Sequence, residues 1–119
     1  MKLATVVLPI ILSGCATKGM YAWGNYDKAL YSAYKNPETV EELRLELEEL
    51  IGDEESRRRR VAPGIYAELG TLYLQKGDAK KAITMYKKER DTWPESKGLM
   101  TAMIQNLERR EGKTQGDEK

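Results

Sequence analysis

Apolar residues recur at helical spacing over most of the chain after residue 24, and this pattern predicts helices rather than strands. A first helix is predicted over about residues 25 to 35, with Tyr26, Leu30 and Tyr34 on one face. We expect this face to pack onto the rest of the domain, whose core has no phenylalanine. The alternative places these rings at a membrane interface, where amphipathic aromatic side chains are favoured.

A second helix is predicted to begin at Asn36 and Pro37, which suit the N-cap and the first helical position. Its apolar stripe consists of Val40, Leu43, Leu47, Leu50 and Ile51. The acidic residues on the rest of its surface, interpreted as a solvated face, are Glu42, Glu46 and Glu49. Gly52 is expected to end this helix, because glycine is common just after a helix C-terminus.

Residues 53 to 60 contain acids and arginines at i,i+4 spacing, which predicts a short charged helix or connector. The four consecutive arginines are Arg57, Arg58, Arg59 and Arg60. Clustered guanidinium groups bind phosphate well, so one interpretation is a contact for acidic lipid, lipopolysaccharide phosphate or an acidic partner. The neighbouring acids weaken that field, and we favour a solvated connector.

Residues 63 to 95 predict a helical hairpin, in which Gly77 ends the first helix and Asp78 caps the second. Gly70 would let the two helices approach closely. The positions that define the pattern are Tyr66, Leu69, Gly70, Tyr73, Ala82, Tyr86 and Pro94. In this order and spacing they resemble one tetratricopeptide repeat. Tyr66, Leu69 and Tyr73 are then expected to meet the returning helix.

The resemblance implies that the inner face of the hairpin offers side chains to a partner peptide, here Ala67, Thr71 and Leu74. These residues lack the lysine and asparagine with which chaperone-binding relatives hold a terminal carboxylate. They would dock a partner helix or receive the second helix of the chain, and we favour the second option. Glu89 replaces a small residue of the family pattern, which predicts looser packing or an exposed end there.

A final helix is predicted over about residues 96 to 110, as a cap on the hairpin. Its apolar face consists of Met100, Met103, Ile104 and Leu107. Because one repeat cannot bury its hydrophobic surface alone, the flanking helices must take the place of neighbouring repeats. The predicted fold is therefore all-α, a small tetratricopeptide-like array of about five helices over residues 25 to 111, followed by a disordered tail over residues 112 to 119.

The first fifteen residues have a different pattern: a lysine, an apolar run over residues 3 to 12, and Leu12-Ser13-Gly14-Cys15. The run is shorter than the ~20 residues of a membrane-spanning helix and predicts a signal peptide. Its last four residues resemble the lipobox of bacterial lipoproteins. This resemblance implies that residues 1 to 14 are removed, that Cys15 is lipidated, and that residues 15 to 24 form a tether. An ordinary secretory signal is the alternative.

The resemblance to bacterial lipoproteins also implies a location. Those kept at the inner membrane commonly carry Asp after the cysteine, whereas this chain has Ala16. We therefore expect a lipid-anchored protein at the outer membrane, on its periplasmic face. Between Cys15 and Tyr21 the chain spans at most ~20 Å, so the folded part must begin close to the lipid headgroups.

Composition narrows the chemistry of this 119-residue chain, which has no histidine and a single cysteine. Without histidine and with one cysteine, the chain lacks the usual metal ligands and the usual pairing of a catalytic nucleophile with a general base. It also cannot form an intramolecular disulfide. Without Lys2 the chain has 19 acidic residues and as many basic ones, which gives no electrostatic case for nucleic acid. We expect no cofactor, no metal, no small-molecule substrate and no enzymatic activity; the remote alternative is a carboxylate-dependent enzyme acting on peptidoglycan.

The lipobox, the aromatic stretch at residues 21 to 26 and the single repeat together resemble a family of short proteobacterial outer-membrane lipoproteins of unknown function. Members are often encoded beside lipoproteins similar to the curli secretion channel. The resemblance implies a lipid-anchored scaffold or adaptor that binds such a lipoprotein in a secretion or surface-assembly complex. The alternative is an activator or assembly factor for peptidoglycan synthases or pili.

Overall fold

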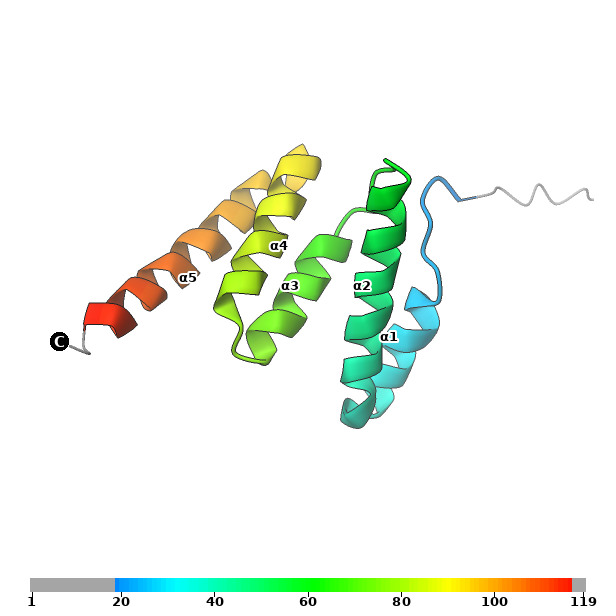
Figure 1. Cartoon of the computed structure of the whole chain (residues 1–119), viewed down its shortest axis with the longest axis horizontal. Helices are drawn as coiled ribbons and strands as arrows, with labels where there is room; N and C mark the ends of the chain where they lie inside the picture. The colour runs from blue at the N-terminus through cyan, green and yellow to red at the C-terminus, as the bar shows by residue number, and fades with distance from the viewer. Residues whose placement is uncertain (1–18, 117–119) are drawn as a thin grey trace, which may run out of the picture.

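The computed structural model describes residues 19–116 of the chain, and these residues form five α-helices and no strand. The helices are α1 (Tyr26–Lys35), α2 (Val40–Ser56), α3 (Ile65–Gln75), α4 (Ala79–Thr92) and α5 (Lys97–Gly116), and two short 3-10 turns are η1 (Pro37–Thr39) and η2 (Pro94–Ser96). The five helices stand in a row in chain order, each packed on the next (Figure 1). The prediction of an all-α helical array is therefore confirmed. The predicted signal peptide and Cys15 lie outside the described residues.

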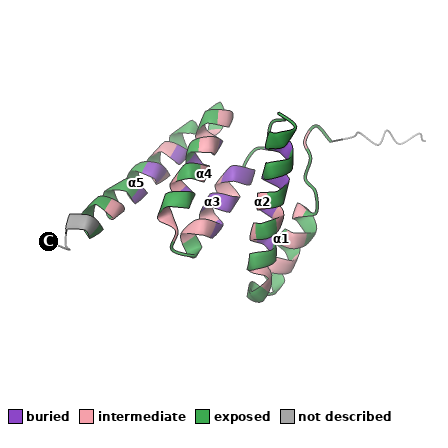
Figure 2. Cartoon of the chain, viewed as in Figure 1, coloured by how far each residue is buried: buried purple, intermediate pink, exposed green. Residues whose placement is uncertain are grey.

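Two hydrophobic clusters hold the row together, and α3 contributes to both. The first joins α2 to α3 and contains Leu43, Leu47, Leu50, Ile51, Val61, Ala62, Ile65, Tyr66, Leu69 and Leu72. The second joins α4 to α5 and contains Ala82, Tyr86, Met100, Ile104 and Leu107. The buried positions lie along the facing sides of these helices, whereas α1 has none (Figure 2). The central helix α3 thus connects two small cores.

The α3–α4 hairpin has the predicted antiparallel form (Figure 1). Gly77 follows the end of α3 with φ at 83°, a left-handed conformation that glycine adopts without strain. The side chain of Asp78 then accepts a hydrogen bond of 3.0 Å from the amide of Lys81 and caps α4. The hairpin turn is therefore specified by the two residues that the sequence indicates.

The stripe on α3 packs differently from the prediction. Tyr66 and Leu69 belong to the cluster with α2, and Tyr73 is shared between both clusters. The hydroxyl groups of Tyr66 and Tyr73 donate to Glu55 and Glu48 of α2. This stripe therefore faces α2 as well as the returning helix, because the row places a neighbour on each side of α3.

Helix α2 passes through Gly52, so the predicted end at this glycine is wrong. The left-handed residue is instead Arg58, with φ at 54°. The amide of Arg59 donates to the carbonyl oxygen of Glu54 at 2.8 Å, which closes the helix end in the manner of a Schellman turn. Glu54 is buried and lies beyond Gly52, so continuing the helix keeps its side chain in the interior.

Helix α1 is rotated relative to the predicted orientation, and the expected packing of Leu30 and Tyr34 is wrong. Its inner face consists of Tyr26, Ala29 and Ala33, whereas Tyr34 is 88% exposed. The amide of Asn25 donates to the Glu46 carboxylate of α2 at 2.8 Å, which fixes the start of α1. Small alanine side chains then allow α1 to lie on α2 at close range. Glu46 accordingly connects α2 to the start of α1 and is not part of a solvated face.

Helix α5 continues to Gly116, beyond residue 111, where the helical domain was predicted to end; residues 117 to 119 lie outside the described part. The added segment is polar, and Thr114 donates to the carbonyl oxygen of Arg110 at 3.1 Å. Arginine, glutamate and lysine are good helix formers, so a helix that is anchored by its first turns continues through them at little cost.

Glu89 is buried rather than exposed, so the prediction of a loose end there is wrong. Its side chain is 1% exposed, and its Oε1 atom accepts hydrogen bonds from the amide of Gly64 at 2.9 Å and from the hydroxyl of Ser96 at 3.2 Å. The carboxylate thus lies at the N-terminus of α3, where the helix dipole favours negative charge. Glu89 joins the start of α3 to the α4–α5 junction.

Candidate partner-binding groove

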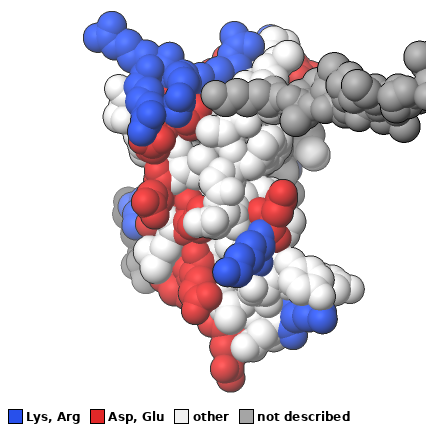
Figure 3. Space-filling model, turned by 90° about the vertical axis from the view of Figure 1, so that its right-hand side faces the viewer, with Lys and Arg blue, Asp and Glu red and all other residues white. Residues whose placement is uncertain are grey.

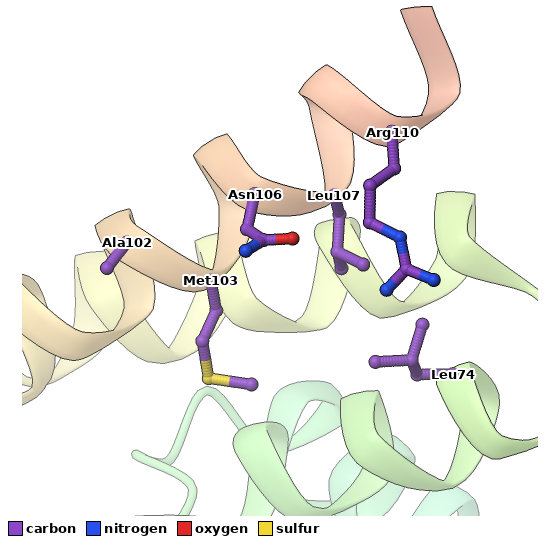
Figure 4. A pocket seen from close by; sticks show the side chains of 6 residues that line it. All are labelled: Leu74, Ala102, Met103, Asn106, Leu107 and Arg110. Carbon is purple, nitrogen blue, oxygen red and sulfur yellow. The ribbon is translucent and has the colours of Figure 1, made fainter. Parts of the chain in front are cut away.

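An open groove of about 300 Å³ lies between α3 and α5 (Figure 4). Leu74 projects from α3, and Met103 and Leu107 project from α5 toward it. Ala102, Asn106 and Arg110 complete the lining from α5. The groove is predominantly apolar, with one amide and one guanidinium at its edge.

The groove exists because α3 and α5 both pack on α4 rather than on each other. On one side, Gly70 places α3 directly against Tyr86 of α4. On the other side, Met100, Ile104 and Leu107 of α5 pack against the same helix. Leu74 and Met103 therefore face each other across a space that no described residue fills, and both are half-buried.

The lining gives the groove a defined chemical preference. Leucine and methionine side chains offer an adaptable apolar surface, of the kind that receives one face of an amphipathic helix. Arg110 is exposed at the edge, and it forms no salt bridge with any residue between 19 and 116. A guanidinium in this position suits a carboxylate on the partner. The groove therefore fits an apolar peptide or helix that carries an acidic residue.

Only one of the three predicted inner-face residues lines this groove. Leu74 does, whereas Ala67 packs against the cluster of α4 and α5. The hydroxyl of Thr71 donates to the carbonyl oxygen of Ala67 at 3.0 Å and lies 3.1 Å from the Tyr86 hydroxyl. Thr71 thus gives the hydroxyl of the buried Tyr86 a hydrogen-bond partner inside the fold. The favoured prediction that these residues receive the second helix is wrong, because α2 packs on the opposite side of α3.

The four arginines directly follow α2, and Arg59 and Arg60 lie beside the first described residues of the chain. A group of basic side chains lies at the top of this end of the molecule (Figure 3). Arg57 pairs with Asp53 at 2.9 Å, and Arg59 pairs with the buried Glu54 at 2.5 Å. Arg60 lies 5.1 Å from the ring centroid of Trp93. Arg58 forms no salt bridge with a described residue, so the acids of α2 compensate only part of this positive charge.

A hollow of about 500 Å³ lies beside these arginines. It is lined by Gly19, Met20, Tyr21, Ala22, Glu54, Arg59 and Arg60. The first described residues therefore share one surface with Arg59 and Arg60. This arrangement places guanidinium groups next to the segment that leads back to Cys15, which the sequence pattern does not reveal.

Trp93 is a structural residue that sequence reasoning missed. It is 6% exposed, its Nε1 donates to the carbonyl oxygen of Val61 at 3.2 Å, and its ring meets that of Tyr21 edge-on at 5.6 Å. It therefore ties the amino-terminal segment and the α2–α3 loop to the α4–α5 junction. The available signal was a large aromatic residue directly before Pro94, at a helix boundary.

The perturbed carboxyl groups join helices rather than forming a reaction centre. Hydrogen bonds from Arg44 and then from Lys76 lower the pKa of Glu41 to about 2, and Lys76 directly follows the end of α3. Partial burial opposes ionisation of Glu55, but hydrogen bonds from Lys88 and Tyr66 prevail and lower its pKa. These pairs link α2 to α3 and α4, away from the groove.

Two further features bear on the kind of site. Among residues 19–116 no three His, Cys, Asp or Glu side chains are grouped so that they could hold a metal ion. Within the same span no helix has both the length and the apolar character needed to cross a bilayer. The groove between α3 and α5, with its apolar lining and the amide and guanidinium at its edge, is taken as the candidate binding site.

The chain matches the model of a known protein family. The profile of a family described as Domain of unknown function (DUF4810) matches residues 20–103, which is more than half of the chain. The match includes α1 to α4 and the first part of α5, with both sides of the groove as far as Met103. No curated protein and no solved structure matches the chain significantly.

Proposed function

Because the chain belongs to the family described as Domain of unknown function (DUF4810), we propose a function from its sequence and geometry: a lipid-anchored scaffold that binds another envelope protein. In this proposal Cys15 carries the lipid, the α3–α4 pair is a tetratricopeptide-like hairpin, and the protein lies on the periplasmic face of the outer membrane. The proposed partner is a lipoprotein similar to the curli secretion channel, within a secretion or surface-assembly complex.

The groove between α3 and α5 is the observation that carries this proposal. Its lining is largely apolar, it is open to solvent, and it lies between α3 and α5 (Figure 4). A groove of this type binds a peptide or helix without any catalytic group. Leu74 and Met103 would contact the apolar face of the partner, and Arg110 would orient an acidic side chain.

The lipid anchor supplies the location. Two or three acyl chains on Cys15 would hold the domain on the bilayer far more firmly than one chain, because each buried methylene contributes ~0.8 kcal/mol. The partner would then be met at the membrane surface, where both proteins are confined. An anchored scaffold accordingly needs only a modest intrinsic affinity in its groove.

Affinity capture with the intact, lipidated protein tests the binding role. We expect the wild-type chain to recover a channel-type lipoprotein and Met103→Lys to lose it, because the substitution places a charge on the apolar wall. Leu45→Gln is the matched control, since Leu45 is 52% exposed on α2 outside the groove. Recovery of peptidoglycan synthases or pilus components instead would favour the activator role, and equal capture by Met103→Lys would refute the groove.

Two simpler measurements test the other parts of the proposal. Mass spectrometry of the mature chain should find Cys15 at the amino terminus with the added mass of diacylglycerol, and Cys15→Ser should lack it. Incubation of the pure protein with peptidoglycan should release no muropeptides. Measurable release would require an enzymatic function that the scaffold proposal does not include.

A further inference from the structure

The exposed large apolar side chains are concentrated near the amino terminus of the described chain. Seven such residues are exposed between residues 19 and 116, and five of them lie between residues 20 and 34. These five, which we term the N-terminal apolar face, are Met20, Trp23, Leu30, Tyr31 and Tyr34. Single exposed apolar residues are ordinary on a protein surface, but their concentration on one short segment is not.

This face has the composition of a surface at a bilayer interface. Tyrosine and tryptophan rings are amphipathic and are favoured at the level of the lipid headgroups. Lys28 and Lys35 are exposed on the same helix, and the ammonium group of Lys35 lies 4.8 Å from the ring centroid of Tyr31. Helix α1 carries one acid, Asp27, against these two lysines. The rings and cations together suit an anionic lipid surface.

The position of α1 in the fold leaves this face available. Helix α1 is the terminal helix of the row, has no buried residue, and packs through Tyr26, Ala29 and Ala33 (Figures 1 and 2). Figure 3 views the molecule from this end, and much of the surface is uncharged, with acidic side chains gathered along one side of it. The fold therefore presents the apolar rings of α1 outward while α2 covers the opposite side of the helix.

The tether brings this face to the membrane. Trp23 is eight residues from Cys15, so the two lie within ~29 Å even if the intervening chain is fully extended. Met20 lies within ~18 Å by the same limit. A lipid anchor at Cys15 therefore holds the N-terminal apolar face within reach of the headgroups at all times, whereas a protein partner must diffuse to it.

We propose that the N-terminal apolar face rests in the headgroup layer of the bilayer that holds the lipid on Cys15. This inference rests on the proposed lipid anchor and deepens it, because it fixes how the domain is oriented. With α1 against the membrane, the groove at the other end of the row is directed away from the lipid and stays open to a partner. The single ligand class proposed for this face is phospholipid.

Site-directed spin labelling of the lipidated full-length protein tests the orientation. Cys15 is the only cysteine and its thiol would be acylated, so Tyr34→Cys provides a unique labelling site. Gln105→Cys on α5 is the control, since both positions are exposed. The proteins are placed in vesicles of phosphatidylethanolamine and phosphatidylglycerol, and collision rates of each label with oxygen and with a water-soluble nickel chelate are measured.

We expect the label at residue 34 to collide several-fold less with the nickel chelate than the label at residue 105, and more with oxygen. Equal exposure of both labels in a protein whose lipid is confirmed by mass would overturn the orientation while the anchor stands. Absence of the lipid and of vesicle binding would overturn the anchor and the orientation together. Protection of residue 34 that requires added envelope proteins would identify a protein-binding face instead and would equally overturn the proposal.

Discussion

Replacing Gly70 by alanine tests the packing on which the helical array depends. A Cβ atom at this position would lie 2.8 Å and 2.9 Å from the Cε1 and Cδ1 atoms of Tyr86 and 3.2 Å from the Cβ atom of Met85. Tyr86 has no exposed surface, and its hydroxyl is 3.1 Å from the Thr71 hydroxyl, so the ring has no room to turn away. The α3–α4 pair must therefore separate.

The expected magnitude follows from two opposing effects. Overpacking a core position costs about 1–3 kcal/mol, whereas alanine is favoured over glycine inside a helix by about 0.8–1 kcal/mol. Because Tyr86 is completely buried, we expect the steric cost to prevail and Gly70→Ala to lower the free energy of unfolding by about 1–2 kcal/mol. In a domain of this size a change of about 1 kcal/mol moves the Tm by roughly 4–8 °C.

Gly52→Ala is the matched control, since Gly52 lies inside α2 and a Cβ there has no atom within 4 Å. We expect this variant to be slightly more stable than wild type, by up to about 1 kcal/mol. Urea unfolding of the chain from residue 15 onward, followed by circular dichroism, measures both variants. Equal stability of Gly70→Ala and Gly52→Ala would refute this prediction, because the close contact between the helices would then impose no steric constraint.

Three further substitutions probe other contacts. Lys76→Met should raise the pKa of Glu41 from about 2 toward its ordinary 4.5, as measured by NMR titration, and an unchanged titration would contradict the pairing. Because the pKa of Glu41 is lowered in the folded state, its ion pairs stabilise the fold above pH 4.5, and this stabilisation is lost as the pH falls through about 2. Glu89→Ala should lower the free energy of unfolding in urea by about 1–3 kcal/mol, because it leaves the amide at the start of α3 without its acceptor, and Glu89→Gln should cost less. Trp93→Phe should cost about 0.5–1.5 kcal/mol for the hydrogen bond to Val61 alone, and a variant as stable as wild type would show that this bond is unimportant.

Local signals in the sequence determined the helices and the hairpin turn. Apolar spacing placed all five helices, and Gly77 with Asp78 marked the turn between α3 and α4. The sequence pattern also predicted that Gly70 allows two helices to approach closely. The short distances from a Cβ atom at this position to Tyr86 confirm the close contact. Such signals act within one or two turns of a helix, so the chain contains them before any tertiary contact forms.

Tertiary structure alone decided which of two apolar faces of α1 turns inward. Tyr26, Leu30 and Tyr34 have helical spacing, but so do Tyr26, Ala29 and Ala33, and periodicity does not rank one above the other. The bond from Asn25 to Glu46 and the close approach to α2 select the alanine face. The outward position of the tyrosines is therefore a property of the whole array.

The groove and the contacts of the buried carboxylates also arise from tertiary packing. Leu74 and Met103 come from helices separated by α4, and Glu89 meets Gly64 across 25 positions of sequence. Sequence by itself determined where helices begin, turn and carry apolar residues, because those preferences are local. Only the packed row decided which side chains face each other, because that depends on the rotation and spacing of helices that are distant in the chain.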